Sequence, residues 1–151
     1  MDRKRLTPDH VKFYQEQGYL IGLPQVFSPD RLKELNEGLA YLRVLLRPGE
    51  DPKEIREWHE TSGFLYDICM NDTILDYVEC LLGPDFFMEG SNFFIKEPHT
   101  SPTVGWHQDA YYWPLYPEDS ITAWIAFLDS DEENGAMRVV PGSHRAGILK
   151  H

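Results

Sequence analysis

The amino-acid sequence predicts an α+β fold, in which a helical layer from the first half of the chain packs against an antiparallel sheet or barrel from the second half. Residues 1–84 carry helix-start signals followed by apolar residues at helical spacing. Residues 85–151 carry short aromatic or β-branched runs separated by Gly and Pro. The length of 151 residues suits one domain with a hydrophobic core. We therefore expect a single domain over 1–151, mostly helical over 1–84 and strand-forming over 85–151.

Helix-start signals occur three times in the first half. Thr7-Pro8-Asp9 and Ser28-Pro29-Asp30 each combine an N-cap hydroxyl, a proline in the first turn and an early carboxylate. We expect the first helix to end at Gly18 and the second at Pro48-Gly49. Asn71 or Asp72 caps a third helix that ends at Gly83-Pro84. The second helix presents a single apolar stripe, formed by Leu32, Leu35, Leu39, Leu42 and Leu46.

The segments between these helices have weaker patterns. Residues 19–21 are short and apolar and predict an edge strand. Residues 50–60 are highly charged and predict an exposed loop or short helix, with His59 on a solvated face.

Four runs in the second half predict strands, at residues 86–88, 93–95, 121–128 and 137–140. The run 121–128 is almost continuously apolar, so we expect it to be covered on both faces or close to it.

The composition excludes some classes of partner. The formal net charge is −11, which disfavours nucleic acid and anionic membrane surfaces because both bind basic patches. Two cysteines, Cys69 and Cys80, are expected on consecutive helices. They make no disulfide framework and are expected as free, buried thiols. No window is long and apolar enough for a membrane span, and the polar N-terminus does not have the pattern of a signal peptide. We expect a cytoplasmic protein with a small-molecule partner; the pattern does not indicate an oligomeric state.

A candidate metal site begins at His107 and Asp109, two positions apart in Gly105-Trp106-His107-Gln108-Asp109. On an extended strand, residues i and i+2 point to the same face, so the two side chains can converge on one point. An imidazole nitrogen and a carboxylate oxygen are two donors of the two-His, one-carboxylate arrangement that binds Fe(II). The spacing alone fits a pair on a surface strand or turn equally well.

The neighbouring motifs distinguish these alternatives. They follow in order as Asn92-Phe93-Phe94-Ile95-Lys96, Pro98-His99, the His-Gln-Asp motif, Trp124-Ile125-Ala126, Glu133-Asn134-Gly135 and Pro141-Gly142-Ser143-His144. The run resembles the phytanoyl-CoA dioxygenase family of Fe(II)- and 2-oxoglutarate-dependent oxygenases. The resemblance is strong over residues 86–151 and looser in the helical half, where Gln17-Gly18-Tyr19-Leu20 is similar to the usual start of the family.

This resemblance implies a double-stranded β-helix (jelly-roll, cupin-like) core with the helices packed on it. It implies Fe(II), 2-oxoglutarate as cosubstrate and O2. His107 and Asp109 would be the catalytic iron ligands, Asn92 and Trp124 would contact 2-oxoglutarate, and the backbone of Gln108 would lie at the cofactor. Related halogenases have a small residue in place of the carboxylate, so Asp109 favours hydroxylation. His144 would lie in a turn rather than on the metal, and Lys96 is either an exposed strand-end lysine or a partner of a carboxylate.

The predicted function is hydroxylation of a small organic substrate with release of succinate and CO2. Tyr111, Tyr112, Trp113 and Tyr116 would line a mouth for an apolar or ring-bearing ligand, or belong to the core. The alternatives are a non-catalytic β-helix binding domain or an inactive fragment that keeps part of the metal site. A metal hydrolase, for which only Glu118 and Asp119 are nearby carboxylates, fits poorly.

The resemblance also implies a third ligand, a histidine, and then an arginine that pairs with 2-oxoglutarate, both at positions after His151. The chain would then be either a fragment of a longer enzyme or a natural truncation. We expect the first, a C-terminally incomplete chain with the β-helix only partly covered.

Overall fold

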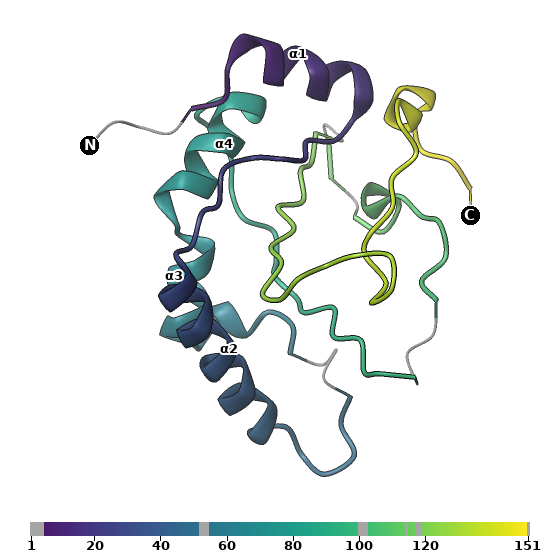
Figure 1. Cartoon of the computed structure of the whole chain (residues 1–151). Helices are drawn as coiled ribbons and strands as arrows, with labels where there is room; N and C mark the ends of the chain where they lie inside the picture. Colours follow the sequence, from purple (N-terminus) through teal and green to yellow (C-terminus); the bar gives the residue numbers. More distant parts are fainter. Residues whose placement is uncertain (1–4, 52–54, 100–102, 114, 117–118, 151) are drawn as a thin grey trace.

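The computed structural model describes residues 5–51, 55–99, 103–113, 115–116 and 119–150. Four α-helices, α1 (Pro8–Gln17), α2 (Pro29–Val44), α3 (Gly63–Cys69) and α4 (Asp72–Leu82), form a curved layer along one side (Figure 1). The described part also has short 3-10 helices, η2 (Trp58–Glu60), η3 (Asp109–Tyr111) and η4 (Ser143–Ala146). The second half is mostly extended chain and lies on the other side of the helical layer.

The predicted capping residues begin the helices. The Thr7 side chain accepts a hydrogen bond from the His10 amide, and the Ser28 side chain accepts one from the Arg31 amide. The Asn71 carboxamide oxygen accepts from two amides of α4, so Asn71 rather than Asp72 is the cap. Each cap satisfies amide groups that have no partner within the helix.

The helix ends agree with the prediction in two places and differ in one. Gly18 takes the left-handed conformation at φ 81° and ends α1, and Gly83 ends α4. Helix α2 ends at Val44, before the predicted Pro48-Gly49, and the chain tightens into a turn in which the Leu45 amide donates to Leu42. Pro48 disfavours helical geometry at Arg47, the residue before it. Leu46, the last leucine of the stripe, lies beyond the end of α2.

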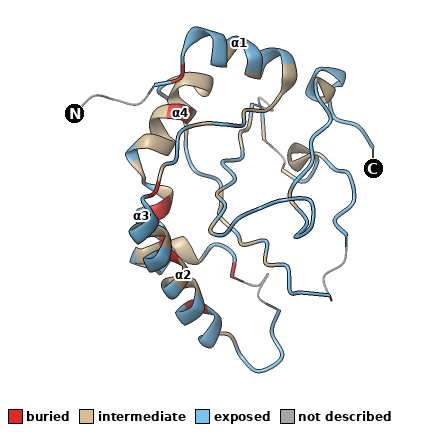
Figure 2. Ribbon diagram, viewed as in Figure 1, coloured by how far each residue is buried: buried red, intermediate tan, exposed pale blue. Residues whose placement is uncertain are grey.

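The hydrophobic core is built on the helical half. It comprises Phe27, Leu35, Leu42, Ile55, Leu65 and Ile68. Leu35 is 0% exposed, and the other leucines of the predicted stripe are buried or pack against the core. Figure 2 shows the buried residues on the helices and on the loop beside them, with none along the described part of the second half.

The charged stretch 50–60 is more than an exposed loop. Ile55 is 1% exposed and belongs to the core. The placement of His59 on a solvated face is wrong, because its side chain is 10% exposed and its Nδ1 shares a 2.7 Å hydrogen bond with Ser91 Oγ. Ile55 is an apolar residue in a charged segment, and its burial against the core is favourable because it removes apolar surface from water.

Helix α3 is the expected helix that carries Cys69, although the sequence did not predict its bounds. Its N-cap is Ser62, and Leu65 and Ile68 on its inner face are buried. Its seven residues are too few for a periodic signal to stand out in the sequence. Cys69, its last residue, and Cys80 in α4 are both free and half-buried. Burial raises the pKa of the Cys69 thiol, and a hydrogen bond with Ser91 opposes that shift in part.

The strands predicted at 19–21, 86–88, 93–95, 121–128 and 137–140 are not formed in the described residues, where one isolated antiparallel bridge joins Arg56 and Asn92. The β-helix core is therefore not confirmed by this structure. A helix satisfies its hydrogen bonds within itself, whereas a strand needs a neighbour at ladder distance. The extended segments have strand-like side-chain patterns without that neighbour.

Two extended segments nevertheless have distinct inner and outer faces. In 91–96, residues 91, 93 and 95 are half-buried and residues 92, 94 and 96 are exposed. In 121–128, the inner residues Ile125 and Phe127 pack against the core. Trp124 is 44% and Leu128 75% exposed, so the prediction that both faces are covered is wrong. Alternate residues of an extended chain face opposite ways, so each segment offers one face to the helices and one away from them.

The Pro141-Gly142-Ser143-His144 turn contacts the end of α1. The Gly142 amide donates to the Gln17 carbonyl at 2.8 Å, and His144 Nε2 lies 3.0 Å from the Gln15 carbonyl. Both are carbonyls of the last turn of the helix, which lack partners within it. His144 is thus held in a turn against α1, and two motifs far apart in sequence meet there.

Among the described residues, no helix is long and apolar enough to cross a membrane.

Candidate metal and cosubstrate site

The candidate site is formed by two extended segments and a short turn. His107 lies on extended chain, Gln108 is extended at φ −121° and ψ 125°, and Asp109 begins η3. The segment 121–128 approaches this turn through Thr122, whose side chain contacts Asp109. The inner residues of 121–128 pack on the core, so the helical layer supports one wall of the site.

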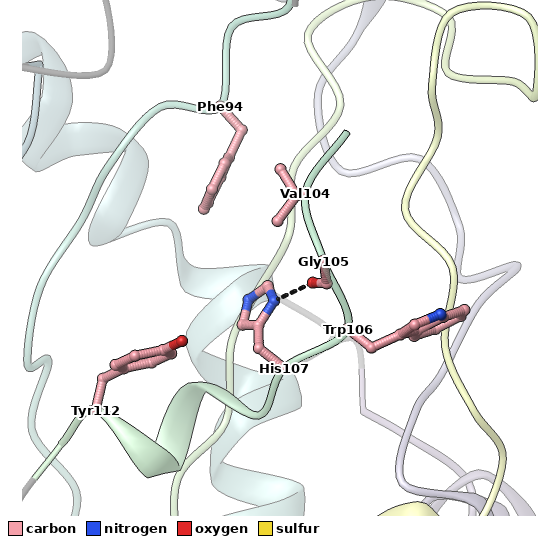
Figure 3. Close-up of a pocket in the computed structure, with 6 residues that line it drawn as sticks. All are labelled: Phe94, Val104, Gly105, Trp106, His107 and Tyr112. Atoms are coloured by element: carbon pink, nitrogen blue, oxygen red, sulfur yellow. Dashed lines mark hydrogen bonds between the residues drawn. The ribbon is translucent and has the colours of Figure 1, made fainter. Parts of the chain in front are cut away.

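The imidazole of His107 has a defined orientation. Its Nδ1 lies 2.8 Å from the Gly105 carbonyl, as Figure 3 shows. A carbonyl oxygen only accepts hydrogen bonds, so Nδ1 carries the proton in this contact. In the neutral ring, Nε2 then presents its lone pair, which is the arrangement of a metal-ligating histidine held by a backbone carbonyl.

The lone-pair nitrogen of His107 faces the carboxylate of Asp109. Nε2 lies 3.4 Å from Asp109 Oδ1. Both side chains are partly exposed. Two acceptor atoms this close are stabilised by a positive charge, either a proton on Nε2 or a metal cation.

These two donors fit a shared metal ion. Ligand bonds of about 2.1 Å at a right angle would place two donor atoms roughly 3 Å apart, close to the spacing seen here. The donor types, a neutral imidazole and a carboxylate, are those of the Fe(II) arrangement. Among the described residues, no group of three His, Cys, Asp or Glu side chains could hold a metal.

Gln108 points away from the His107 and Asp109 pair. Its Nε2 donates to the Gly147 carbonyl at 3.1 Å, and its Oε1 accepts from the Leu149 amide at 2.6 Å. The Gln108 side chain thus forms two hydrogen bonds with the backbone of residues 147–149. The side chain of Gln108 therefore lies on the opposite face from His107 and Asp109, as expected for the middle residue of three on an extended chain.

Asn92 and Trp124 lie on the outer faces of their segments. Asn92 is exposed and forms the bridge with Arg56, and Trp124 is two positions after Thr122 on the same face. The structure does not record a contact between either residue and His107 or Asp109 in the described part of the chain. Lys96 donates from Nζ to the Gly135 carbonyl at 2.6 Å.

An open surface pocket of about 300 Å³ lies beside His107. It is lined by Phe94, Val104, Gly105, Trp106, His107 and Tyr112. In Figure 3 the Phe94 and Tyr112 rings lie on one side of His107, and the Trp106 side chain extends away on the other. Of the four aromatic residues predicted at a mouth, Tyr112 lines this pocket and the other three are not among its lining residues. Tyr116 is 97% exposed.

Phe94, Val104 and Thr122 were missed by the sequence reasoning. Phe94 lies two residues after Asn92 in the Asn92-to-Lys96 motif. On an extended chain this spacing places both side chains on the same face, and this was the available signal. Thr122 gave no signal, because a hydroxyl within an apolar run reads as a strand residue. Glu118 lies outside the described residues, and Asp119 is exposed.

Comparison with known proteins identifies the family of the chain. A family model described as "Phytanoyl-CoA dioxygenase (PhyH)" matches residues 14–151. The chain belongs to the phytanoyl-CoA dioxygenase family. The family has a cupin-like jelly-roll fold, whereas the described residues of this chain form no sheet, so its β-helix core is not confirmed.

Several relatives are named as dioxygenases or hydroxylases. Human peroxisomal phytanoyl-CoA dioxygenase is 29% identical over all of this chain and 51% of its own length. The probable α-ketoglutarate-dependent hypophosphite dioxygenase of Stutzerimonas stutzeri is 31% identical over 71% of this chain and 35% of its own. The L-proline trans-4-hydroxylase of Streptomyces griseoviridis is 26% identical over 91% and 55%.

The chain spans about half the length of the phytanoyl-CoA dioxygenases that it matches. No solved structure matches it. The cytoplasmic location stays a prediction.

Proposed function

We propose that this chain forms part of an Fe(II)- and 2-oxoglutarate-dependent dioxygenase that hydroxylates a small organic molecule. The observation that supports the proposal most directly is the pair formed by His107 Nε2 and Asp109 Oδ1 at 3.4 Å, with the imidazole tautomer fixed by the Gly105 carbonyl. Membership of the family adds the expected cofactors.

The roles of the residues follow from their positions. His107 and Asp109 would bind the metal, and their outward face leaves room for further ligands. When bound, Fe(II) with 2-oxoglutarate and O2 supplies the oxidising chemistry, which yields succinate, CO2 and a hydroxylated product. Asn92 and Trp124 would contact the cosubstrate from neighbouring segments, and the backbone of Gln108 would border it. The Gln108 side chain holds residues 147–149 against the site.

The pocket beside His107 indicates the kind of substrate. Its walls are mainly apolar and aromatic, with Phe94, Val104 and Tyr112 around the imidazole. A volume of about 300 Å³ is at the lower end of small-molecule sites. We propose a small substrate that places an apolar or ring-bearing part next to the metal pair.

The proposal is tested on a form of the protein that includes the third ligand and the arginine expected after His151. Fe(II) and 2-oxoglutarate are added without oxygen and the visible spectrum is recorded. We expect a charge-transfer band from the chelated keto acid, and succinate after oxygen is admitted. In a His107→Ala/Asp109→Ala variant the band should disappear, since metal affinity should fall by about 100-fold or more.

A matched double variant, His99→Ala/Asp85→Ala, changes the same residue types at exposed positions outside the site and should keep the band. A band that survives removal of His107 and Asp109, or that never forms in the wild-type chain, would refute the proposal. Binding of metal and 2-oxoglutarate without succinate would instead support a non-catalytic binding domain.

A further inference from the structure

Thr122 contacts the candidate ligand carboxylate directly. Its hydroxyl donates to Asp109 Oδ2 at 2.7 Å, across 13 residues of sequence. A hydrogen bond from a hydroxyl to a carboxylate is charge-assisted and is stronger than one between neutral groups.

This hydrogen bond gives the two oxygens of the carboxylate different partners. Oδ2 accepts from Thr122, while Oδ1 is the oxygen that faces His107 Nε2. The terminal torsion of an aspartate is broad and roughly two-fold, so the carboxylate has little rotational preference of its own. A donor fixed on one oxygen therefore selects the orientation that presents the other oxygen to the imidazole.

The position of Thr122 is itself set by the helical layer. The inner residues of its segment, Ile125 and Phe127, pack on the core. Asn36 of α2 donates from Nδ2 to the Phe127 carbonyl at 2.8 Å. Threonine is branched at Cβ and has few χ1 choices, so a fixed backbone gives a fixed hydroxyl.

We propose that Thr122 is a positioning residue that holds the Asp109 carboxylate in a monodentate orientation for metal binding. Thr122 would orient Asp109 in the same way as the Gly105 carbonyl orients the other proposed ligand, His107, through its Nδ1. The inference rests on the proposed function, because it assigns a metal to the His107 and Asp109 pair.

The test compares binding of Co(II) alone to a form of the protein that includes the third ligand expected after His151 and to variants of that form, by calorimetry and by the visible absorption of the bound ion. Thr122→Val keeps the branched shape and removes the hydroxyl, and should weaken Co(II) binding by about 10- to 100-fold. It should also alter the intensity of the Co(II) bands, because the released carboxylate can bind through both oxygens. Thr122→Ser keeps the hydroxyl and should bind within about threefold of the wild-type chain.

Thr73→Val makes the same chemical change on α4 and should leave both readouts unchanged. Since Thr122 is exposed, these variants should fold; if Thr122→Val does not, Thr122→Ala gives the same contrast with Thr122→Ser. Co(II) binding in Thr122→Val equal to the wild-type chain, with the same bands, would overturn this inference and leave the proposed function standing. Absence of Co(II) binding in the wild-type chain, or binding unaffected by His107→Ala, would overturn both.

Discussion

The helical half of the chain contains the buried core, whereas the half from residue 85 onward contributes no buried residue in the described part and leaves many large apolar side chains at the surface. Every buried core residue of the described chain, from Leu6 to Tyr77, belongs to the first half. In the second half, Phe87 and Leu128 are each 75% exposed and Met137 is 60% exposed. The difference shows how local and non-local structure form. Helices need only a shared apolar stripe to pack, while strands need paired neighbours before their second face can be covered.

The two halves are joined at a small number of defined contacts. Ser91 is tied to Glu57 and His59, Phe127 to Asn36, and Gly142 with His144 to the end of α1. Two of these contacts hold segments that flank the candidate site. The helical half therefore acts as the support on which the site residues of the second half are arranged.

The largest expected effect tests the difference in burial. Leu35→Ala removes a side chain that is 0% exposed, and should lower the free energy of unfolding by about 2–5 kcal/mol, because a cavity remains in the core. Leu128→Ala makes the same change at a position that is 75% exposed and should cost about 0.5 kcal/mol or less. Denaturant unfolding of both variants gives the comparison. Equal losses would show that the second half is packed as firmly as the first.

The next effect tests the contact between α1 and the Pro-Gly-Ser-His turn. A Cβ at Gly18 would lie 2.4 Å from His144 Nδ1, and the backbone there has φ +81°. Gly18→Ala should destabilise the chain by about 2 kcal/mol through both causes. Gly22→Ala, at φ +72° with open space around it, carries the backbone cost alone, about 1 kcal/mol.

A second substitution separates these causes. His144→Ala in the Gly18→Ala background should recover part of the loss, because the clash is gone. Purely additive effects of the two substitutions in thermal or denaturant unfolding would contradict the contact.

The smallest effect tests the link between the loop before α3 and residue 91. Ser91→Ala removes the hydroxyl bonded to the His59 ring, whose side chain is 10% exposed, and should cost about 1 kcal/mol. Ser130→Ala, at an exposed serine, is the matched control and should be neutral within about 0.5 kcal/mol. A neutral Ser91→Ala in denaturant unfolding would mean that water replaces the hydroxyl without loss.

The predicted part of the fold is the part with local causes. The helix starts could be predicted from Thr7, Ser28 and Asn71, because capping depends on residues a few positions apart. The leucine stripe of α2 predicts its buried face for the same reason. Ile55, His59 and the one-sided burial of 121–128 were mispredicted because each depends on a partner distant in sequence.

The candidate site divides in the same way. The spacing of His107 and Asp109 indicated that their side chains can converge, since an extended chain alternates its faces, but the spacing fitted a surface pair equally well. The contact of Thr122 with Asp109, and the pairing of Gln108 with residues 147–149, could not be found in the sequence. They arise from segments brought together only by packing on the helices.

The sequence by itself indicated the family, through motifs spread over residues 86–151. It also predicted three helix starts with their caps and the candidate pair His107 and Asp109, because each of these depends on residues close to one another in the chain. Only the tertiary structure decided which tautomer of His107 faces Asp109 and which oxygen of Asp109 faces His107. The physical reason is that a hydrogen bond orients a side chain only when its partner is at the right distance. For Asp109 that partner, Thr122, comes from a separate segment held by the helical core.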